Sequence, residues 1–434
     1  MKTSIIQQLR YPTVAIPTSL LEYVGKSVTL RGYYVTNTQY YNILPIDAHI
    51  EQDRVYEIGK IFSDEEIKSE IIPSCLIERL NSVVLGKTTS SSSSSNKLRS
   101  GAKSYIEIEK AEEHKFNVSL PQLFGYWNNG TLQLFEAFRE PEEDGKIIIT
   151  PVKKDSYSLK LDLFSRNTGI LESDVMLKKK ALFIGCGSVG SLVAVELAKA
   201  GVGHFMLVDN DIFGYHNICR HQCGIYDVGR FKTDALADRI LSINPYAEVK
   251  KFNLPIEDVD RDEVLSFCNS DTIIVGGADN REGDLYACNL GIRAGSSFVS
   301  IGCWERAFAG EIFYCLPEGT PTYKDFLAVT GYVSGRVTQN RRFYTTEADL
   351  EKVSFEPGIS ADVNFVTIVG VKLILDLLNR DNDGYTQRVL PYLTQYTLVC
   401  NTNDTRIGGD QAEIFSYPLQ VTTSIIVPYA GESV

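Results

Sequence analysis

The stretch Ala181-Leu182-Phe183-Ile184-Gly185-Cys186-Gly187-Ser188-Val189-Gly190 decides the fold, because it joins a short apolar run to a glycine-rich turn. Residues 191–200 follow with helical character, and Gly201 is placed to end that helix. A second apolar run, 204–208, closes on Asp209-Asn210-Asp211. Strand, glycine turn, helix, strand and acidic end together predict a βαβ unit of the kind that binds nucleotides.

Strands and helices continue to alternate after this unit. Residues 233–243 and 364–379 have apolar residues at helical spacing, whereas 271–277 and 297–301 are short apolar runs typical of buried strands. This alternation predicts an α/β fold with a Rossmann-like, mostly parallel sheet and helices on both faces.

The chain before this region has a different character. Its clearest patterns predict strands over 27–35, 104–109 and 146–152, a helix that begins after Ser63, and a flexible loop at the serine run 90–95. We therefore expect two domains. Residues 1–163 would form a β-rich α+β accessory domain that recognises a substrate or partner, and residues 164–434 would form the nucleotide-binding domain.

Bulk composition excludes several classes of function. A net charge of -12 over 434 residues argues against broad nucleic-acid binding, which needs clustered Lys and Arg. We find neither a membrane-spanning apolar run nor a signal peptide, so a cytoplasmic location with no membrane partner is the expectation. The nine cysteines include no C-x-x-C pair, which predicts free thiols and no zinc site.

The glycine turn has a clear physical role. Gly185 and Gly187 let the backbone turn tightly and approach phosphate, and Gly190 lets the helix pack close to the strand. Asp209, or alternatively Asp211, is placed to accept hydrogen bonds from ribose hydroxyls. These features alone suit a nicotinamide-dependent oxidoreductase as well as an ATP-using enzyme.

A polar cluster downstream separates these two possibilities. It contains Asn217, Arg220 and Lys232, followed by Asp279 just after the strand at 271–277. Hydride transfer has no need of such a cluster. Attack of a carboxylate on the α-phosphate of ATP does need it, because charge builds on the phosphates and on departing pyrophosphate. Asp279 would hold Mg²⁺, which bridges the phosphates.

These motifs, in this order, resemble the ThiF/MoeB/HesA superfamily, the prokaryotic relatives of ubiquitin-activating enzymes. The resemblance covers roughly residues 166–380. It rests on the glycine loop, the acidic strand end, Asn-x-x-Arg at 217–220, Asp-Val-Gly-x-x-Lys at 227–232, Ala-Asp-Asn at 278–280, and an upstream Ser-Arg that ends in Arg166.

The resemblance implies an adenylyltransferase that uses ATP and Mg²⁺. Its substrate would be the C-terminal carboxylate of a ubiquitin-like protein, sulfur carrier or peptide with a flexible tail. Arg220, Lys232 and Asn217 would hold the phosphates, and Arg166 would reach the site of a partner subunit, which implies a homodimer. The size of the N-terminal region favours a bacterial ubiquitin-like conjugation or antiphage defence system, in which a conjugating enzyme is a further candidate partner.

The sequence departs from the family pattern at several points. Where many relatives have Gln after the Arg, this chain has His221, which either hydrogen-bonds the phosphates or shifts the local geometry. The family's zinc cysteines are missing from 319–326, and the expected crossover loop at about 318–357 contains no cysteine. Cys303 is the best candidate thiol nucleophile, with a small strand-end residue as the alternative. The loop carries basic and aromatic residues that we expect to hold the substrate tail, with an exposed loop of ordinary charges as the alternative: Tyr332, Arg336, Arg341, Arg342, Phe343 and Tyr344.

Two other functions remain open at this point. One is a non-catalytic scaffold of the same fold that binds a ubiquitin-like protein. The complete set of Arg220, Lys232 and Asp279 argues against it, because a scaffold does not need these residues. The other is a nicotinamide-dependent oxidoreductase, which the polar cluster disfavours.

Overall fold

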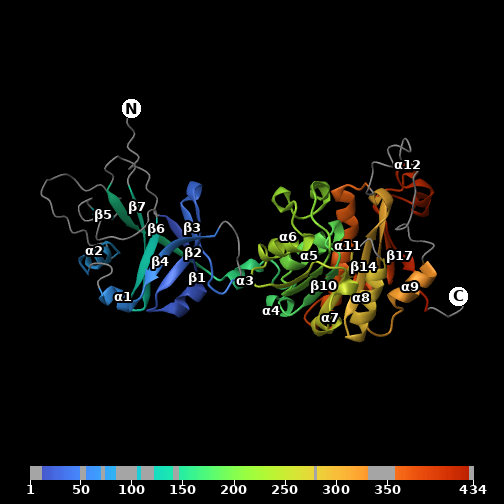
Figure 1. The fold of residues 1–434 in the computed structure, drawn as a ribbon, viewed down its shortest axis with the longest axis horizontal. Helices are drawn as coiled ribbons and strands as arrows, with labels where there is room; N and C mark the ends of the chain where they lie inside the picture. Colours follow the sequence, from blue (N-terminus) through green and yellow to red (C-terminus); the bar gives the residue numbers. More distant parts are fainter. Residues whose placement is uncertain are drawn as a thin grey trace, which may run out of the picture. The chain divides into compact units, whose positions relative to one another are not determined.

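The computed structural model describes residues 12–48, 55–69, 74–84, 105–108, 122–139, 146–277, 281–330 and 357–429. The chain divides into two compact units, Met1–Asp162 and Leu163–Val434 (Figure 1). This division lies one residue before the boundary that the change in sequence character predicts. Within the described ranges, no helix is both long and apolar enough to cross a membrane.

The first unit is built on a nine-stranded sheet in the order β5-β8-β7-β6-β4-β2-β3-β1-β9. Its strands are β1 (Thr13–Pro17), β2 (Val28–Val35), β3 (Tyr40–Ile43), β4 (Tyr56–Phe62), β5 (Ile106–Ile108), β6 (Gln122–Asn128), β7 (Thr131–Arg139), β8 (Ile147–Pro151) and β9 (Lys153–Tyr157). The helices include η2 (Thr18–Tyr23), α1 (Asp64–Lys68) and α2 (Ser74–Val84), and α3 (Leu159–Leu163) follows β9.

This sheet curls back on itself. Strands β8 and β9 lie near its two ends, yet only Val152 separates them in the chain. The backbone N–H of Val152 and the Lys154 ammonium both donate to carbonyls of β7, at Leu134 and Leu132. Across the curl, the Tyr41 hydroxyl donates to the buried Glu136 carboxylate at 2.6 Å. Burial raises the pKa of Glu136 above its ordinary value, and the hydrogen bond from Tyr41 opposes that rise.

The two faces of the curled sheet have separate apolar cores. On β7, Leu132 and Leu134 join one cluster, whereas Phe135 and Ala137 join the other, which α2 covers. The period-2 alternation of strand side chains produces this division. The predicted strands correspond to β2, β5 and β8, and Ser63 forms a capping box with Glu66 at the start of α1. The serine run at 90–95 lies outside the described residues.

The second unit contains an eight-stranded sheet in the order β12-β11-β10-β13-β14-β15-β16-β17. Its strands are β10 (Lys180–Ile184), β11 (His204–Val208), β12 (Glu248–Phe252), β13 (Thr272–Gly276), β14 (Ser297–Cys303), β15 (Ala309–Cys315), β16 (Tyr396–Cys400) and β17 (Val421–Ile425). Its helices include α4 (Ser173–Met176), α5 (Ser188–Lys199), η5 (Tyr215–Arg220), α6 (Lys232–Leu241), α7 (Arg261–Phe267), α8 (Arg281–Arg293), α9 (Tyr323–Thr330), α11 (Ser360–Leu378) and α12 (Thr405–Gly408).

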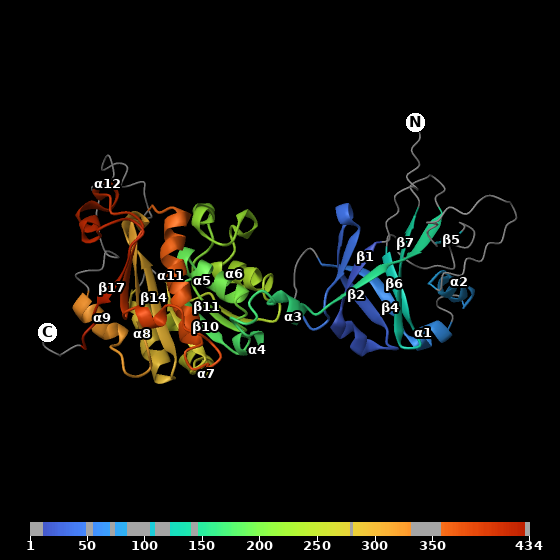
Figure 2. The ribbon, with the colours of Figure 1, turned by 180° about the vertical axis from the view of Figure 1, so that it is seen from behind.

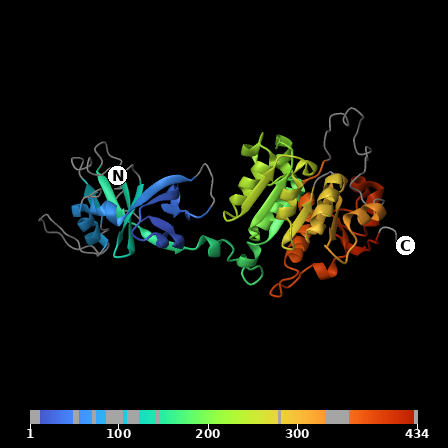
Figure 3. The same ribbon diagram turned by 60° about the horizontal axis from the view of Figure 1, so that its bottom comes forward.

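The first five strands in this order, from β12 through β11, β10 and β13 to β14, pair in parallel. Strands β15, β16 and β17 extend the sheet with antiparallel pairing. Along β10, Phe183 packs into the core shared with α5, α6 and α11, whereas Leu182 packs into the core shared with α7, α8 and α9. Figures 1 and 2 show this unit from opposite sides, with α8 toward the viewer in Figure 1 and α11 toward the viewer in Figure 2, and Figure 3 shows the ribbon turned by 60°. The predicted α/β class with helices on both faces is confirmed.

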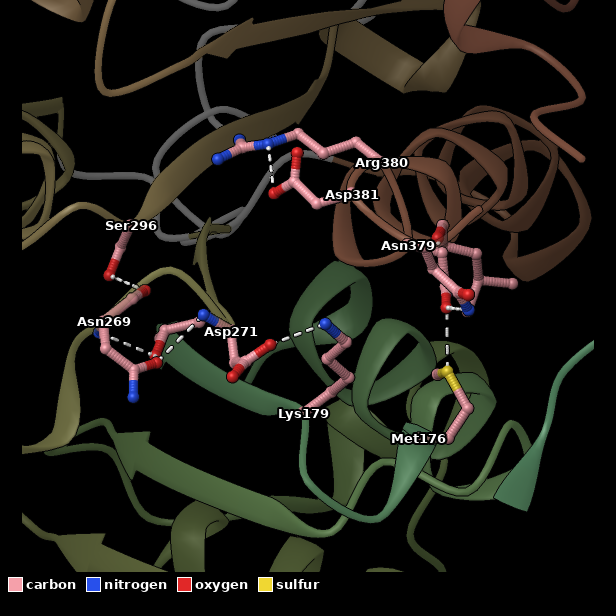
Figure 4. Close-up of polar contacts among 11 residues, drawn as sticks. Met176, Lys179, Asn269, Asp271, Ser296, Asn379, Arg380 and Asp381 are labelled. Carbon is pink, nitrogen blue, oxygen red and sulfur yellow. Dashed lines mark hydrogen bonds and ion pairs between the residues drawn. The ribbon is translucent and has the colours of Figure 1, made fainter. Parts of the chain in front are cut away.

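Polar contacts tie the chain together where the parallel strands begin (Figure 4). Lys179 precedes β10 and forms an ion pair with Asp271 at 2.6 Å, just before β13. Asn379, after α11, donates to the Met176 sulfur at 3.4 Å. Because this is the amino edge of the sheet, these contacts lie at the opposite ends of the strands from the expected ligand edge.

Sequence patterning located some elements and missed others. The predicted strands and helices correspond to β10, β11, β13, β14, α5, α6 and α11. Strand β12 was not predicted, because its sequence Glu-Val-Lys-Lys-Phe lacks an apolar run. The expected crossover loop at 318–357 begins with a helix, α9, and its residues 331–356 lie outside the described ranges.

Candidate nucleotide site

A cavity of about 440 Å³ lies at the carboxyl ends of β10, β11 and β13. This is the edge of a parallel sheet where nucleotides bind. The cavity is lined by Ile184, Gly185, Gly187, Val208, Asp209, Asn210, Asp211, Lys232, Leu254, Pro255, Ile256, Glu257, Gly277 and Gly283. Five of the residues predicted to bind or act on the nucleotide are therefore brought together here: Gly185, Gly187, Asp209, Asp211 and Lys232.

Two positions of the glycine loop, 185 and 190, require glycine. Gly185 has a φ of +91°, in the region that side chains disfavour. A Cβ on Gly190 would lie 2.1 Å from the Gly185 carbonyl oxygen, so the helix could not pack this close to the strand. Gly187 is the N-cap of α5, where no side chain caps the helix. The first N–H groups of α5 are therefore open to an anion.

Asp209 holds the glycine loop through the backbone. Its carboxylate accepts from the N–H of Cys186 at 2.7 Å and from the N–H of Asp211 at 2.8 Å. Burial raises the pKa of Asp209, and Lys232 and the two N–H donors oppose that rise. One of the two predicted ribose acceptors therefore also stabilises the loop.

Asp211 and Lys232 form an ion pair across the cavity wall. The Lys232 ammonium lies 2.6 Å from a carboxylate oxygen of Asp211. The Lys232 side chain is 11% exposed and the Asp211 side chain 62% exposed. A mostly buried cation therefore faces the cavity with its charge balanced by a hydrated carboxylate.

The η5 segment carries Asn217 and Arg220. The Asn217 side-chain oxygen accepts from the N–H of Gly214 at 2.8 Å and so fixes the entry to the segment. An Arg220 guanidinium nitrogen lies 3.6 Å from where a Cβ on Gly358 would sit. Arg220 thus lies beside the point at which the described chain resumes after residue 356, next to the start of α11.

His221 is buried and uses both ring nitrogens within the protein. Nε2 lies 2.7 Å from the carbonyl oxygen of Cys186, and Nδ1 accepts from the N–H of Cys223 at 3.0 Å. Burial lowers the pKa of His221 to about 4, the hydrogen bond to Cys186 opposes this change, and Lys232 adds to it. In this arrangement the neutral ring has no N–H left for a phosphate.

Arg166 lies away from the cavity of its own chain. The neighbouring Phe164 ring packs 3.7 Å from the Cβ position of Gly201, and the Asn167 amide donates to the Lys199 carbonyl. Lys199 is the last residue of α5, a helix of 12 residues that spans about 18 Å. Arg166 is therefore near the end of α5 opposite to the glycine loop.

Two predicted residues remain, Asp279 and Cys303. Asp279 lies outside the described residues. Cys303 ends β14 opposite Gly310, is half-buried, and does not line the cavity. Among the described residues, no group of three or more His, Cys, Asp or Glu side chains is arranged to hold a metal ion.

Sequence analysis missed one wall of the cavity. Leu254, Pro255, Ile256 and Glu257 follow the end of β12 and line the cavity beside Asp209. An apolar wall at this position suits the flat face of a nucleotide base. The run Leu-Pro-Ile carries that signal, but it is interpretable only once β12 is recognised beside β11.

Comparison with protein families bears on this arrangement. The ThiF family model matches residues 159–406, which is more than half of the chain. The chain belongs to the ThiF family. The predicted resemblance is confirmed, and the matched region contains the glycine loop, η5, Lys232 and the whole cavity wall.

Curated relatives of this ThiF-family chain match parts of it. A probable molybdopterin-synthase adenylyltransferase of Porphyra purpurea is 27% identical over 158 residues, 36% of this chain and 40% of the relative. The sulfur carrier protein ThiS adenylyltransferase of Bacillus subtilis is 27% identical over 180 residues, 39% of this chain and 53% of the relative. The ATP-dependent ubiquitin transferase-like protein Cap2 of Escherichia coli is 35% identical over 82 residues, 18% of this chain and 14% of the relative. The matches thus span about half or less of each relative.

Proposed function

We propose that this ThiF-family chain is an ATP-dependent adenylyltransferase. It activates the C-terminal carboxylate of a ubiquitin-like protein, a sulfur carrier or a peptide and releases pyrophosphate. One observation supports the proposal above all: a single cavity at the carboxyl edge of the sheet is lined by the glycine loop, Asp209, Asp211 and Lys232. The names of the relatives from Porphyra purpurea and Bacillus subtilis support the same reaction.

The cavity suits ATP in both shape and charge. The open N-terminus of α5 and the Lys232 ammonium would receive the phosphates, and the 254–257 wall would receive the base. A volume of about 440 Å³ agrees with the size of ligand sites for small molecules. The ribose would then lie beside Asp209 and Asp211, between the base and the phosphates.

In the proposed reaction, a carboxylate oxygen of the substrate attacks the α-phosphorus of ATP. A new O–P bond forms, the bond to the bridging oxygen breaks, and pyrophosphate leaves with the electron pair, which yields an acyl adenylate. Lys232 and Arg220 would stabilise the charge that develops on the phosphates. The Asp211 carboxylate would release Lys232 toward the phosphates, because its exposed position lets water replace the ammonium.

Mg²⁺ would supply further neutralisation of the phosphate charge when bound. Asp279 is the side chain proposed to hold it, together with phosphate oxygens of ATP. Magnesium is usually bound through only one or two protein carboxylates, so a single Asp is enough for this role.

We propose that the working unit is a homodimer in which Arg166 acts on the partner's nucleotide. The position of Arg166, at the far end of α5 from its own glycine loop, supports a role in trans. A conjugating enzyme is a further candidate partner. We propose a bacterial ubiquitin-like conjugation system, such as one used in antiphage defence, as the setting. The name of the Escherichia coli relative, an ATP-dependent ubiquitin transferase-like protein, supports the ubiquitin-like part of this proposal.

The decisive experiment is carrier-dependent ATP–pyrophosphate exchange. Candidate carriers are ubiquitin-like proteins and peptides encoded beside the gene for this chain, each with a flexible tail. We expect exchange with one carrier and its loss in Lys232→Ala. Lys199→Ala is the matched control, because Lys199 is exposed and pairs with Glu196 on the surface of α5.

Other outcomes would assign a different function. Tight carrier binding without exchange would favour the non-catalytic scaffold. Tight NAD binding without exchange would favour an oxidoreductase. Neighbouring genes that encode only cofactor biosynthesis would contradict the conjugation setting while leaving adenylation intact.

A further inference from the structure

His221 joins two loops that carry separate parts of the candidate site. It follows Arg220 directly at the end of η5, and its Nε2 lies 2.7 Å from the Cys186 carbonyl oxygen in the glycine loop. His221 is 8% exposed, and its imidazole packs edge-on against Phe213, with ring centroids 4.9 Å apart. The contact therefore bridges the glycine loop and the arginine segment inside the protein.

The two hydrogen bonds define the state of the ring. The N–H of Cys223 can only donate, so Nδ1 must accept and carries no proton. The Cys186 carbonyl can only accept, so Nε2 carries the proton and donates. The ring is neutral in a single tautomer, and burial favours that neutral form.

Cys186 is consequently held from both sides by side chains. Its N–H donates to Asp209 at 2.7 Å, and its carbonyl accepts from His221 at 2.7 Å. The peptide planes on either side of Cys186 cannot rotate without breaking one of these bonds. The N–H groups that follow, from Gly187 into α5, are thereby aimed at the position proposed for the phosphates.

The segment after His221 is anchored to the same helix. The N–H of Gln222 donates to the Ser191 hydroxyl of α5 at 3.4 Å, and Cys223 is buried in the core. The chain from 221 to 223 is therefore fixed to the glycine loop at one point and to α5 at another. Arg220, one residue before, starts from a backbone whose position depends on these bonds.

We propose that His221 is a positioning residue that sets Arg220 and the glycine loop at a fixed separation around the α-phosphate of ATP. It acts through the Cys186 carbonyl and does not contact the nucleotide. This inference depends on the proposed adenylation and identifies the contacts that hold the adenylation site together. A side chain with one donor and one acceptor is required at this position, because apolar packing alone would leave the Cys186 carbonyl and the Cys223 N–H unsatisfied.

Three variants separate positioning from packing. His221→Phe keeps a ring against Phe213 and removes both hydrogen bonds, whereas His221→Gln keeps a donor and an acceptor. His204→Gln is the matched control, because His204 starts β11 at the amino edge and pairs with Glu248 at 3.2 Å. Carrier-dependent ATP–pyrophosphate exchange gives kcat and KM for ATP, calorimetry gives the Kd of ATP, and thermal unfolding gives Tm.

Displaced catalytic groups lower the rate of the chemical step more than they weaken binding. We therefore expect His221→Phe to lose on the order of 10- to 100-fold in kcat, with a smaller rise in KM. His221→Gln and His204→Gln should stay within about threefold of wild type. The difference between wild type and His221→Gln should be constant from pH 6 to 8, because the ring stays neutral there.

Unchanged kcat/KM in His221→Phe would overturn the proposal, as would a His221→Gln variant as impaired as His221→Phe. A wild-type advantage that disappears as pH rises from 6 to 8 would instead indicate a cationic phosphate ligand. If wild type binds ATP without any exchange, the adenylation proposal fails. The positioning proposal then requires that His221→Phe raise the Kd of ATP more than His221→Gln and His204→Gln do. If wild type binds no ATP, both proposals fail.

Discussion

At the scale of single residues, Asp209 and Asp211 differ although the chain places them two positions apart. Asp209 accepts from two backbone N–H groups and is largely buried, whereas Asp211 is mostly hydrated and pairs with Lys232. A carboxylate that replaces water around buried N–H groups contributes to folding. An ion pair whose carboxylate stays hydrated contributes less to folding. The sequence alone gives Asp209, or alternatively Asp211, as the ribose acceptor and does not distinguish their structural roles.

We predict that Asp209→Asn lowers the free energy of unfolding by about 1–3 kcal/mol, because an amide can satisfy only one of the two N–H donors. Asp211→Asn should change it by less than about 1 kcal/mol. Urea unfolding can be followed by Trp304 fluorescence in a Trp127→Phe background, which reports on the second unit. Equal losses in the two variants would contradict the different roles assigned to them.

A second prediction at this scale concerns pH. The folded pKa of His221 is about 4, below the ordinary value near 6.5. Between those values the unfolded chain binds a proton that the folded chain does not, so stability must fall as pH falls. The contribution of His221 to that loss is on the order of 2 kcal/mol between pH 7.5 and 5.

The measurement is urea unfolding of wild type and His221→Gln at both pH values. The variant should lose less stability than wild type on acidification, because it lacks the titrating ring. Lys232 and Asp227 are the charged groups that act on His221, and both are retained in the variant. Parallel pH profiles for the two proteins would show that the ring titrates normally in the fold.

At the scale of elements, the last turn of α11 anchors the connection to β16. Asp376 is buried there and accepts from the N–H groups of Arg388, Val389 and Leu390 and from the Tyr385 hydroxyl. A carboxylate near a helix C-terminus is repelled by the negative end of the helix dipole. The four donors offset this effect and hold residues 385–390 against the helix.

We predict that Asp376→Asn destabilises the second unit by roughly 2–4 kcal/mol, because loss of the charge weakens several buried hydrogen bonds together. Asp381→Asn is the control, since the Asp381 side chain is 75% exposed and pairs with the neighbouring Arg380 (Figure 4). Its effect should stay below about 1 kcal/mol. A small effect of Asp376→Asn would mean that the connection is held by apolar packing alone.

At the scale of the whole molecule, the ThiF-family unit carries Arg166 near the end of α5 that lies opposite to its own glycine loop. A dimer in which Arg166 acts in trans makes a quantitative prediction. Arg166→Ala and Lys232→Ala should each abolish exchange alone. In a mixed dimer one of the two sites would regain both residues, so an equal mixture should recover about a quarter of wild-type activity.

The mixture must be allowed to exchange subunits, and sedimentation or light scattering should show the dimer. Lys199→Ala mixed with Lys232→Ala is the control and should give only the activity of its intact subunits. No recovery in the Arg166→Ala and Lys232→Ala mixture, with subunit exchange demonstrated, would contradict action in trans.

The sequence by itself determined the βαβ unit, the family and several of the residues that meet at the cavity. These features depend on local patterns: an apolar run of strand length, glycines where backbone atoms nearly touch, and polar residues just after strands. The capping box at Ser63 and Glu66 was predictable for the same reason, because its partners lie within one helical turn.

Only the tertiary structure decided the separate roles of those residues. The 254–257 wall depends on β12 pairing beside β11, and the anchoring of Cys186 depends on His221, 35 positions away in the chain. The separation of Arg166 from the glycine loop likewise follows from the length and packing of α5. Local patterns report what one stretch of chain prefers, whereas these roles arise from hydrogen bonds and burial between distant stretches, which form only when the sheet assembles.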